Sequence, residues 1–126
     1  LLSEGTSKAI ERFNALLNSG ENEIEDRFAL FNLHLKSNNK LMALEQLSHI
    51  TGDIKTSREN CSLIAIMYFN INNIEYANDW LHQAILSRET GEMFWDLIIS
   101  DKFKQLHKNE RFKKLMKSIN HPAFID

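Results

Sequence analysis

The sequence is poor in the residues that interrupt helices, cross-link chains or build membrane spans. It has one proline, four glycines and one cysteine in 126 residues, and no run of eighteen or more apolar residues. A single cysteine excludes an intrachain disulfide and a multi-cysteine metal site, and the lack of a long apolar run argues against a membrane-spanning helix. Because so few helix breakers are present, the sequence predicts an all-α fold.

Strong charge of one sign is also lacking, since the formal net charge is only −2. No field of the whole protein would therefore recruit nucleic acid or an anionic membrane. The distribution is uneven, however. Residues 1–100 carry eight Lys/Arg against fourteen Asp/Glu, a balance of −6, whereas residues 101–126 carry seven against three, a balance of +4.

The N-terminal residues show no signal peptide, and the chain opens Leu-Leu-Ser rather than with Met. We therefore expect a fragment of a longer protein. The lone thiol favours a reducing compartment, and the expected location is the cytoplasm.

Helical windows lie between the breakers, and three of the four glycines fall where helix C-termini need a positive φ. Asn38-Asn39 and Asn72-Asn73 lie in turns, where asparagine tolerates left-handed geometry. The expected helices cover residues 6–18, 23–36, 40–51, 57–70, 74–87, 92–100 and 109–119, with a short turn of helix near 102–107.

Two of these windows differ in pattern. Segment 57–70 is apolar on nearly every side, which is typical of a helix buried between other helices. Segment 74–87 alternates apolar residues with Asn78, Asp79, Gln83 and Ser87, and we expect it to form an outer wall.

A constant period relates three parts of the chain. Ala9, Ala43 and Ala77 are equally spaced, and a large apolar residue follows each of them after four positions. A fixed period of about 34 residues, with a turn between two helical patterns, is the signature of tetratricopeptide (TPR) repeats.

Residues 58–89 resemble a TPR repeat. The usual pattern W-x2-L-G-x2-Y, then A-x3-F, reads here Cys61-x2-Ile64-Ala65-x2-Tyr68, then Ala77-x3-Leu81. Residues 24–57 match more loosely, because Phe31 replaces the small residue and His34 the tyrosine. The resemblance implies a right-handed α-α superhelix, or solenoid, of antiparallel helix pairs. It would form one domain over residues 1–126, with a half repeat 1–22, repeats 23–56 and 57–90, and capping helices 91–126.

The C-terminal segment carries a second resemblance. Asp101-x-Phe103-x2-Leu106-x2-Asn109-Glu110-Arg111-Phe112-x2-Leu115 looks like the closing segment of TPR regions in bacterial regulators, including ToxR-like winged-helix activators and some cyclases, with Lys102 and Glu110 replacing two prolines. This resemblance leaves open that the chain is the C-terminal sensory or oligomerisation domain of a transcriptional or signalling regulator.

The TPR resemblance implies a concave groove lined by the first helix of each pair, in which the family binds peptides. Carried over residue by residue, it gives Phe28, Asn32, Leu35, Lys36, Ser62, Ile66, Phe69 and Asn70. Such a groove would be mostly apolar with amide donors and would suit a partner helix or extended peptide. The competing interpretation is that its apolar residues pack on one another or on the C-terminal helices. The chaperone-tail carboxylate clamp is not expected, because Phe28, Ser62 and Ile66 stand where its polar residues would.

Other functions find little support in the sequence. The five histidines show no recognised zinc spacing, and no nucleophile–base pair, phosphate-binding glycine loop or carboxylate dyad stands out. We expect no cofactor, no metal and no enzymatic activity. His34 and Cys61 are expected to be buried. The basic C-terminal residues are expected to form the solvated face of a helix rather than a nucleic-acid surface, because no aromatic residues are interleaved with them. Self-association remains open.

Overall fold

The computed structural model describes residues 3–119, and every regular element in that range is a helix. The elements are α1 (Glu4–Ser19), α2 (Glu23–Lys36), α3 (Lys40–Thr51), α4 (Ile54–Glu59), α5 (Cys61–Asn70), α6 (Ile74–Leu86), α7 (Glu92–Ile99), the 3₁₀ turn η1 (Asp101–Phe103), α8 (Lys104–His107) and α9 (Glu110–Ser118). The all-α prediction is confirmed over this range. The extreme ends of the predicted domain, residues 1–2 and 120–126, lie outside it.

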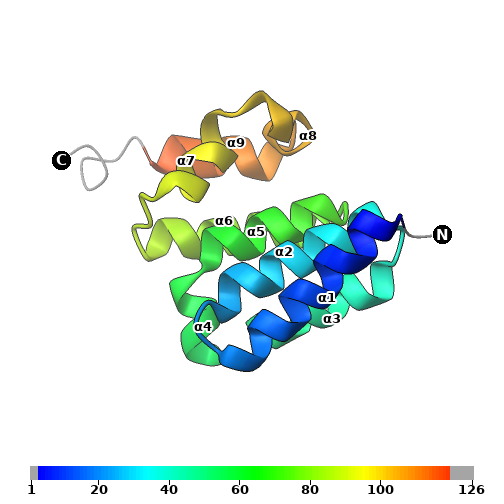
Figure 1. Cartoon of the computed structure of the whole chain (residues 1–126). Helices are drawn as coiled ribbons and strands as arrows, with labels where there is room; N and C mark the ends of the chain where they lie inside the picture. The colour runs from blue at the N-terminus through cyan, green and yellow to red at the C-terminus, as the bar shows by residue number, and fades with distance from the viewer. Residues whose placement is uncertain (1–2, 120–126) are drawn as a thin grey trace. The chain divides into compact units, whose positions relative to one another are not determined.

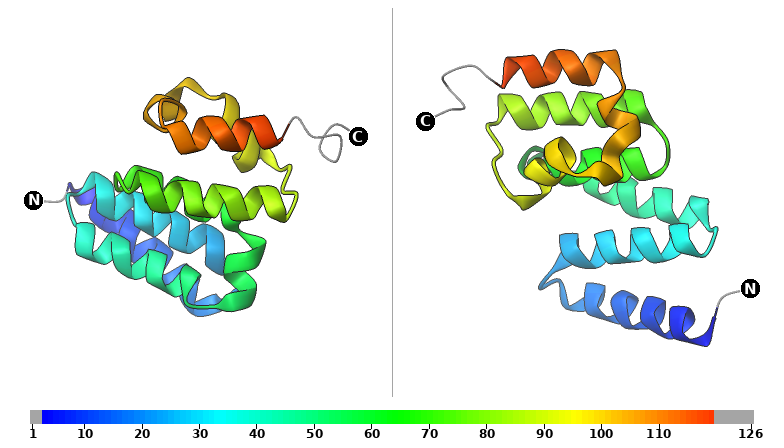
Figure 2. Two further views of the ribbon diagram at one scale, coloured as in Figure 1. Left: turned by 180° about the vertical axis from the view of Figure 1, so that it is seen from behind. Right: turned by 90° about the horizontal axis from the view of Figure 1, so that it is seen from above.

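The chain divides into two compact units, residues 1–54 and 55–126. In the first unit, α2 packs against both α1 and α3, and the three helices run antiparallel in succession (Figures 1 and 2). Its buried apolar residues are Leu30, Phe31, Ala43, Leu47 and Ile50. Helix α1 has no fully buried residue and covers this core with half-buried side chains.

In the second unit, α5 pairs with α6, α7 packs against α5, and α9 packs against α6 (Figure 2). Every residue from Cys61 to Met67 is buried, as the all-round apolar pattern predicts. The apolar residues of the closing motif, Phe103, Leu106, Phe112 and Leu115, are buried too. Lys113, Lys114 and Lys117 are exposed on α9, as expected for a solvated face.

The turn between α2 and α3 and the turn between α5 and α6 have the same geometry, and they are separated by the same interval as Ala43 and Ala77. Asn38 and Asn72 have φ of 59° and 64°. The next residue, Asn39 or Asn73, donates its N–H to the carbonyl of His34 or Tyr68, at 2.8 and 2.9 Å. Its side-chain oxygen then caps the following helix, at 3.3 and 3.1 Å from the amide nitrogens of Met42 and Tyr76. Each three-residue turn therefore ends one helix and begins the next.

The expectation for the glycines was wrong, because only Gly20 has a positive φ, of 72°. Gly52 ends α3 in right-handed geometry, and Gly91 lies before α7 in extended geometry. Left-handed conformations after α2, α5 and α6 are instead taken by Asn38, Asn72 and Arg88. The left-handed geometry expected for the asparagine pairs is confirmed at Asn38 and Asn72, whereas the position after α6 was not expected to adopt it.

The single helix expected over 57–70 is divided into α4 and α5. Asn60 leaves the helical region, with φ −132° and ψ 36°, and its side-chain amide donates to the carbonyl of Thr56 at 2.8 Å. The N–H groups freed at the start of α5 are accepted by the carboxylate of Glu89. The break could not be predicted from the local sequence, because a distant side chain stabilises it and no Gly or Pro occurs there.

The left-handed turn gives a stability prediction. Asn72→Gly should change the free energy of unfolding by less than about 0.5 kcal/mol, whereas Asn72→Val should lower it by about 1–2 kcal/mol, because a β-branched residue resists positive φ. Asn70→Val, in the last turn of α5, is the control, since Asn and Val have similar helix propensities. Urea unfolding of the three variants measures the difference. Equal losses at positions 70 and 72 would contradict the role of the turn.

Candidate functional site

The first set of predicted groove residues lies along one stripe of α2. Phe28, Asn32, Leu35 and Lys36 follow the spacing of a single helix face. Of the buried residues of the helix, Asp26, Leu30 and His34 fall on the opposite side, and Phe31 borders the stripe, three positions after Phe28. Asn32 and Lys36 are exposed, while Phe28 and Leu35 are half-buried. This stripe offers two apolar side chains together with one amide and one ammonium group.

The second set occupies the equivalent positions of α5, one period further along the chain, but its surroundings differ. Ser62 and Ile66 are only 2% and 7% exposed. Phe69 is half-buried and packs edge-on against Phe103, with ring centroids 4.9 Å apart. Asn70 alone is exposed. The chain's own closing segment therefore covers part of the α5 stripe, in line with the packing alternative for Phe69.

The N-terminus of α5 is capped by a carboxylate from beyond α6. Glu89 Oε2 accepts from the amide of Cys61 at 3.0 Å, and Oε1 accepts from the amide of Ser62 at 3.1 Å. A carboxylate at this end of a helix also meets the positive pole of the helix dipole. Glu89 thus ties the end of the α5–α6 pair back to its beginning.

Cys61 is buried in this cap, and its surroundings make it unreactive. Its thiol donates to the carbonyls of Ser57 and Arg58, at 3.4 and 3.5 Å. Burial, followed by the negative charge of Glu89, raises the pKa of the Cys61 thiol to about 11. Since the thiolate is the nucleophilic form, the group stays protonated and inert at neutral pH.

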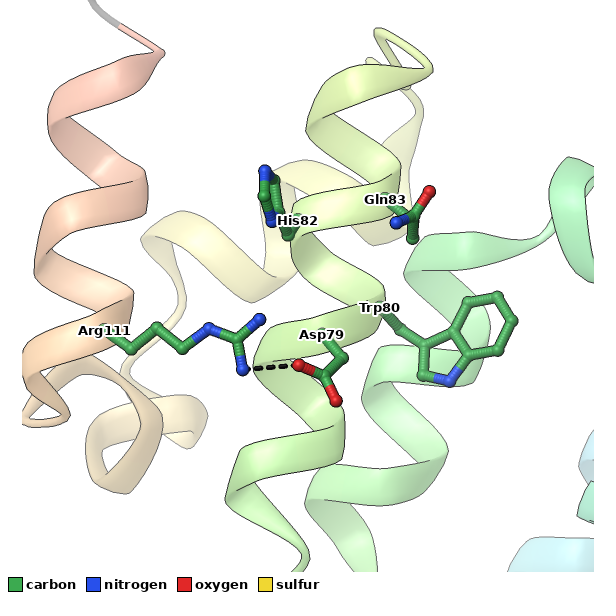
Figure 3. A pocket seen from close by; sticks show the side chains of 5 residues that line it. All are labelled: Asp79, Trp80, His82, Gln83 and Arg111. Carbon is green, nitrogen blue, oxygen red and sulfur yellow. Dashed lines mark ion pairs between the residues drawn. The ribbon is translucent and has the colours of Figure 1, made fainter.

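A shallow hollow of about 420 Å³ lies on the outer side of α6, where Arg111 of α9 approaches Asp79 (Figure 3). Trp80 and Gln83 border its other side. The Arg111 guanidinium forms an ion pair with Asp79, lies 3.7 Å from a Glu75 carboxylate oxygen, and donates to the Glu75 carbonyl at 3.4 Å. Its charge is used to hold α9 on α6, so this guanidinium is not available to a ligand in the hollow.

Asn78 was expected on the polar side of its helix and is instead fully buried. Its side-chain amide donates to Asn109 Oδ1 at 3.0 Å and to the carbonyl of Ile74 at 3.2 Å. Asn109 Oδ1 in turn caps α9 by accepting from Arg111 and Phe112. Because the two asparagines come from helices far apart in sequence, spacing along α6 gave no sign of the pair.

His34 is 5% exposed, as its core position predicts, and burial lowers the pKa of its imidazole. Over residues 3–119, no three His, Cys, Asp or Glu side chains converge closely enough to hold a metal ion. Within the same range, no helix combines the length and the apolar character needed to cross a membrane.

Comparisons of the chain with family models, with characterised proteins and with solved structures find no match.

The Glu89 cap gives a prediction for the chain's single thiol. Glu89→Gln removes the charge that raises the Cys61 pKa, so this pKa should fall below about 11, while burial keeps it above the ordinary 9.0. Alkylation by iodoacetamide, followed as a function of pH, measures the shift. Glu92→Gln is the matched control, because it removes a neighbouring carboxylate that makes no hydrogen bond to α5. Identical profiles for Glu89→Gln and the unaltered chain would contradict this assignment.

Proposed function

We propose that this chain is a non-catalytic interaction module of TPR type, a right-handed solenoid of helix pairs that binds a protein or peptide along the first helices of its pairs. The observation that carries the proposal is the turn shared by α2–α3 and α5–α6, which repeats the same backbone hydrogen bonds and the same asparagine cap at the interval of the alanine period. A repeat of this kind is characteristic of proteins that bind partners along an extended surface.

Burial at equivalent positions supports the same proposal. Ala43 and Ala77 are both 0% exposed, and Leu30 and Ile64 share that value. Small residues at the crossing of two helices allow their backbones to approach, which is the role that the TPR pattern gives to these alanines. The two pairs thus resemble each other in packing as well as in their turns.

The partner-binding surface in this proposal centres on the α2 stripe. Half-buried Phe28 and Leu35 would provide apolar contacts, and exposed Asn32 and Lys36 would provide hydrogen bonds. An amphipathic helix or an extended peptide with apolar anchors matches this chemistry. On α5, only Phe69 and Asn70 of the four predicted residues would contribute to this surface, because Ser62 and Ile66 are buried.

A charge-reversal pair tests the α2 surface. Peptides selected from a random display library on the unaltered chain should bind Asn32→Glu/Lys36→Glu at least about tenfold more weakly, because both side chains are exposed and their loss leaves the fold intact. Ser48→Glu/Lys40→Glu on α3 makes the same change in charge at exposed positions and should stay within about twofold. The proposal is wrong if no peptide is enriched, or if both double variants weaken binding equally while circular dichroism shows intact helices.

A second candidate function, the sensory or oligomerisation domain of a bacterial regulator, is favoured by the outer face of α7. Trp95 and Ile99, one helical turn apart, are 39% and 73% exposed. The opposite face of α7 buries Phe94 and Leu97. Exposed apolar side chains grouped on one helix face are typical of association surfaces.

Sedimentation velocity tests this second candidate. The chain should show a concentration-dependent dimer, and Ile99→Lys should shift it to monomer by placing a charge in the apolar contact. Leu41→Lys is the matched control, because Leu41 is also highly exposed, at 81%, but lies on α3. A chain that remains monomeric, or a dimer that both variants weaken alike, would remove the support for self-association through α7.

A further inference from the structure

A hollow of about 300 Å³ opens within the second unit beside the N-terminal end of α5. Three carboxylates line it: Glu59 at the end of α4, Glu89 after α6, and Glu92 at the start of α7. No Lys, Arg or His side chain is among the described residues that line it. The hollow is therefore acidic without a compensating charge of its own.

The three carboxylates differ in how many hydrogen bonds and ion pairs they form. Glu89 uses one oxygen for each of the two amides that it caps. Glu59 and Glu92 form no ion pair with any residue in the range 3–119. Two carboxylates are thus left to meet a cation that enters the hollow, and the third adds negative potential behind them.

Ser62, which also lines the hollow, provides a second and independent indication of a ligand. It is 2% exposed, and its hydroxyl makes no hydrogen bond in the described part of the chain. A buried hydroxyl without a partner is destabilising, so native proteins rarely leave one unsatisfied. A donor placed in the hollow would supply the missing partner.

The remaining wall is apolar and is formed by Leu63, Met93 and Phe94. An apolar wall beside carboxylates suits a ligand with a hydrocarbon stem and a cationic head. A bare metal ion does not fit, because no three acidic side chains of the described residues converge on one point. The separated carboxylates instead require a cation with donors pointing in several directions.

We propose that this hollow binds the side chain of an arginine presented by a polypeptide partner. The planar guanidinium has five donors, enough to reach Glu59, Glu92 and the Ser62 hydroxyl together, whereas a lysine ammonium is a compact point charge. Free arginine is a poorer ligand, because its own α-carboxylate would enter an acidic site. The hollow shares no residue with the α2 stripe, so the inference stands whether or not α2 binds a peptide.

The test is an NMR titration of the ¹⁵N-labelled chain with N-acetyl-arginine amide, which imitates an arginine within a polypeptide. We expect saturable shifts confined to the backbone amides of Ser62, Leu63 and Phe94. N-acetyl-lysine amide and free L-arginine should bind at least about threefold more weakly, and N-acetyl-norleucine amide should produce no saturable shift.

Variants assign the interaction to these residues. Glu59→Gln/Glu92→Gln should weaken binding by about tenfold, and Ser62→Ala by about threefold. Glu25→Gln/Glu110→Gln removes two exposed carboxylates outside the hollow and should have no effect. Absence of a saturable shift, equal losses in the two double variants, or tighter binding of lysine amide or free arginine would each overturn the proposal. None of these experiments involves the α2 stripe. A negative result would therefore overturn the inference about the hollow without bearing on the proposed function.

Discussion

A turn of only three residues between paired helices is the constraint on which both units depend. Asn38 and Asn72 adopt left-handed geometry, and the asparagine after each closes one helix and caps the next. So short a connection forces the two helices to lie antiparallel and in contact, and each second helix buries an alanine, Ala43 or Ala77, completely.

In the second unit, the Glu89 cap adds a constraint at the start of α5, whereas no side chain of the described residues caps the start of α2. By accepting the amides of Cys61 and Ser62, Glu89 fixes where α5 begins and allows the chain to break at Asn60. The same carboxylate contributes to the raised pKa of Cys61. It also lies in the acidic hollow beside the unpartnered hydroxyl of Ser62. One side chain therefore links helix geometry, thiol chemistry and the charge of a candidate site.

Patterns in the local sequence predicted those structural features that depend on residues close together in the chain. The constant period and the asparagine pairs predicted the helices on either side of each turn, and the apolar run predicted the burial of α5. The break at Asn60 and the burial of Asn78 were missed, because Glu89 and Asn109 stabilise them from other helices. The residues of the α2 stripe came from the TPR resemblance, and helical spacing places them on one face. The acidic hollow could not be predicted in this way, because its carboxylates come from three separate elements.

The uneven charge of the chain bears on which partner either surface would meet first. Residues 1–100 carry a balance of −6, and the hollow concentrates three carboxylates without a basic neighbour in its lining. Potentials of this sign accelerate the encounter with basic partners and discourage acidic ones, even where the contacts that hold the complex are apolar. The exposed lysines of α9 belong to the basic C-terminal part of the sequence. The proposed partner of the hollow, a polypeptide that presents arginine, would thus be favoured in its approach as well as in its final contacts.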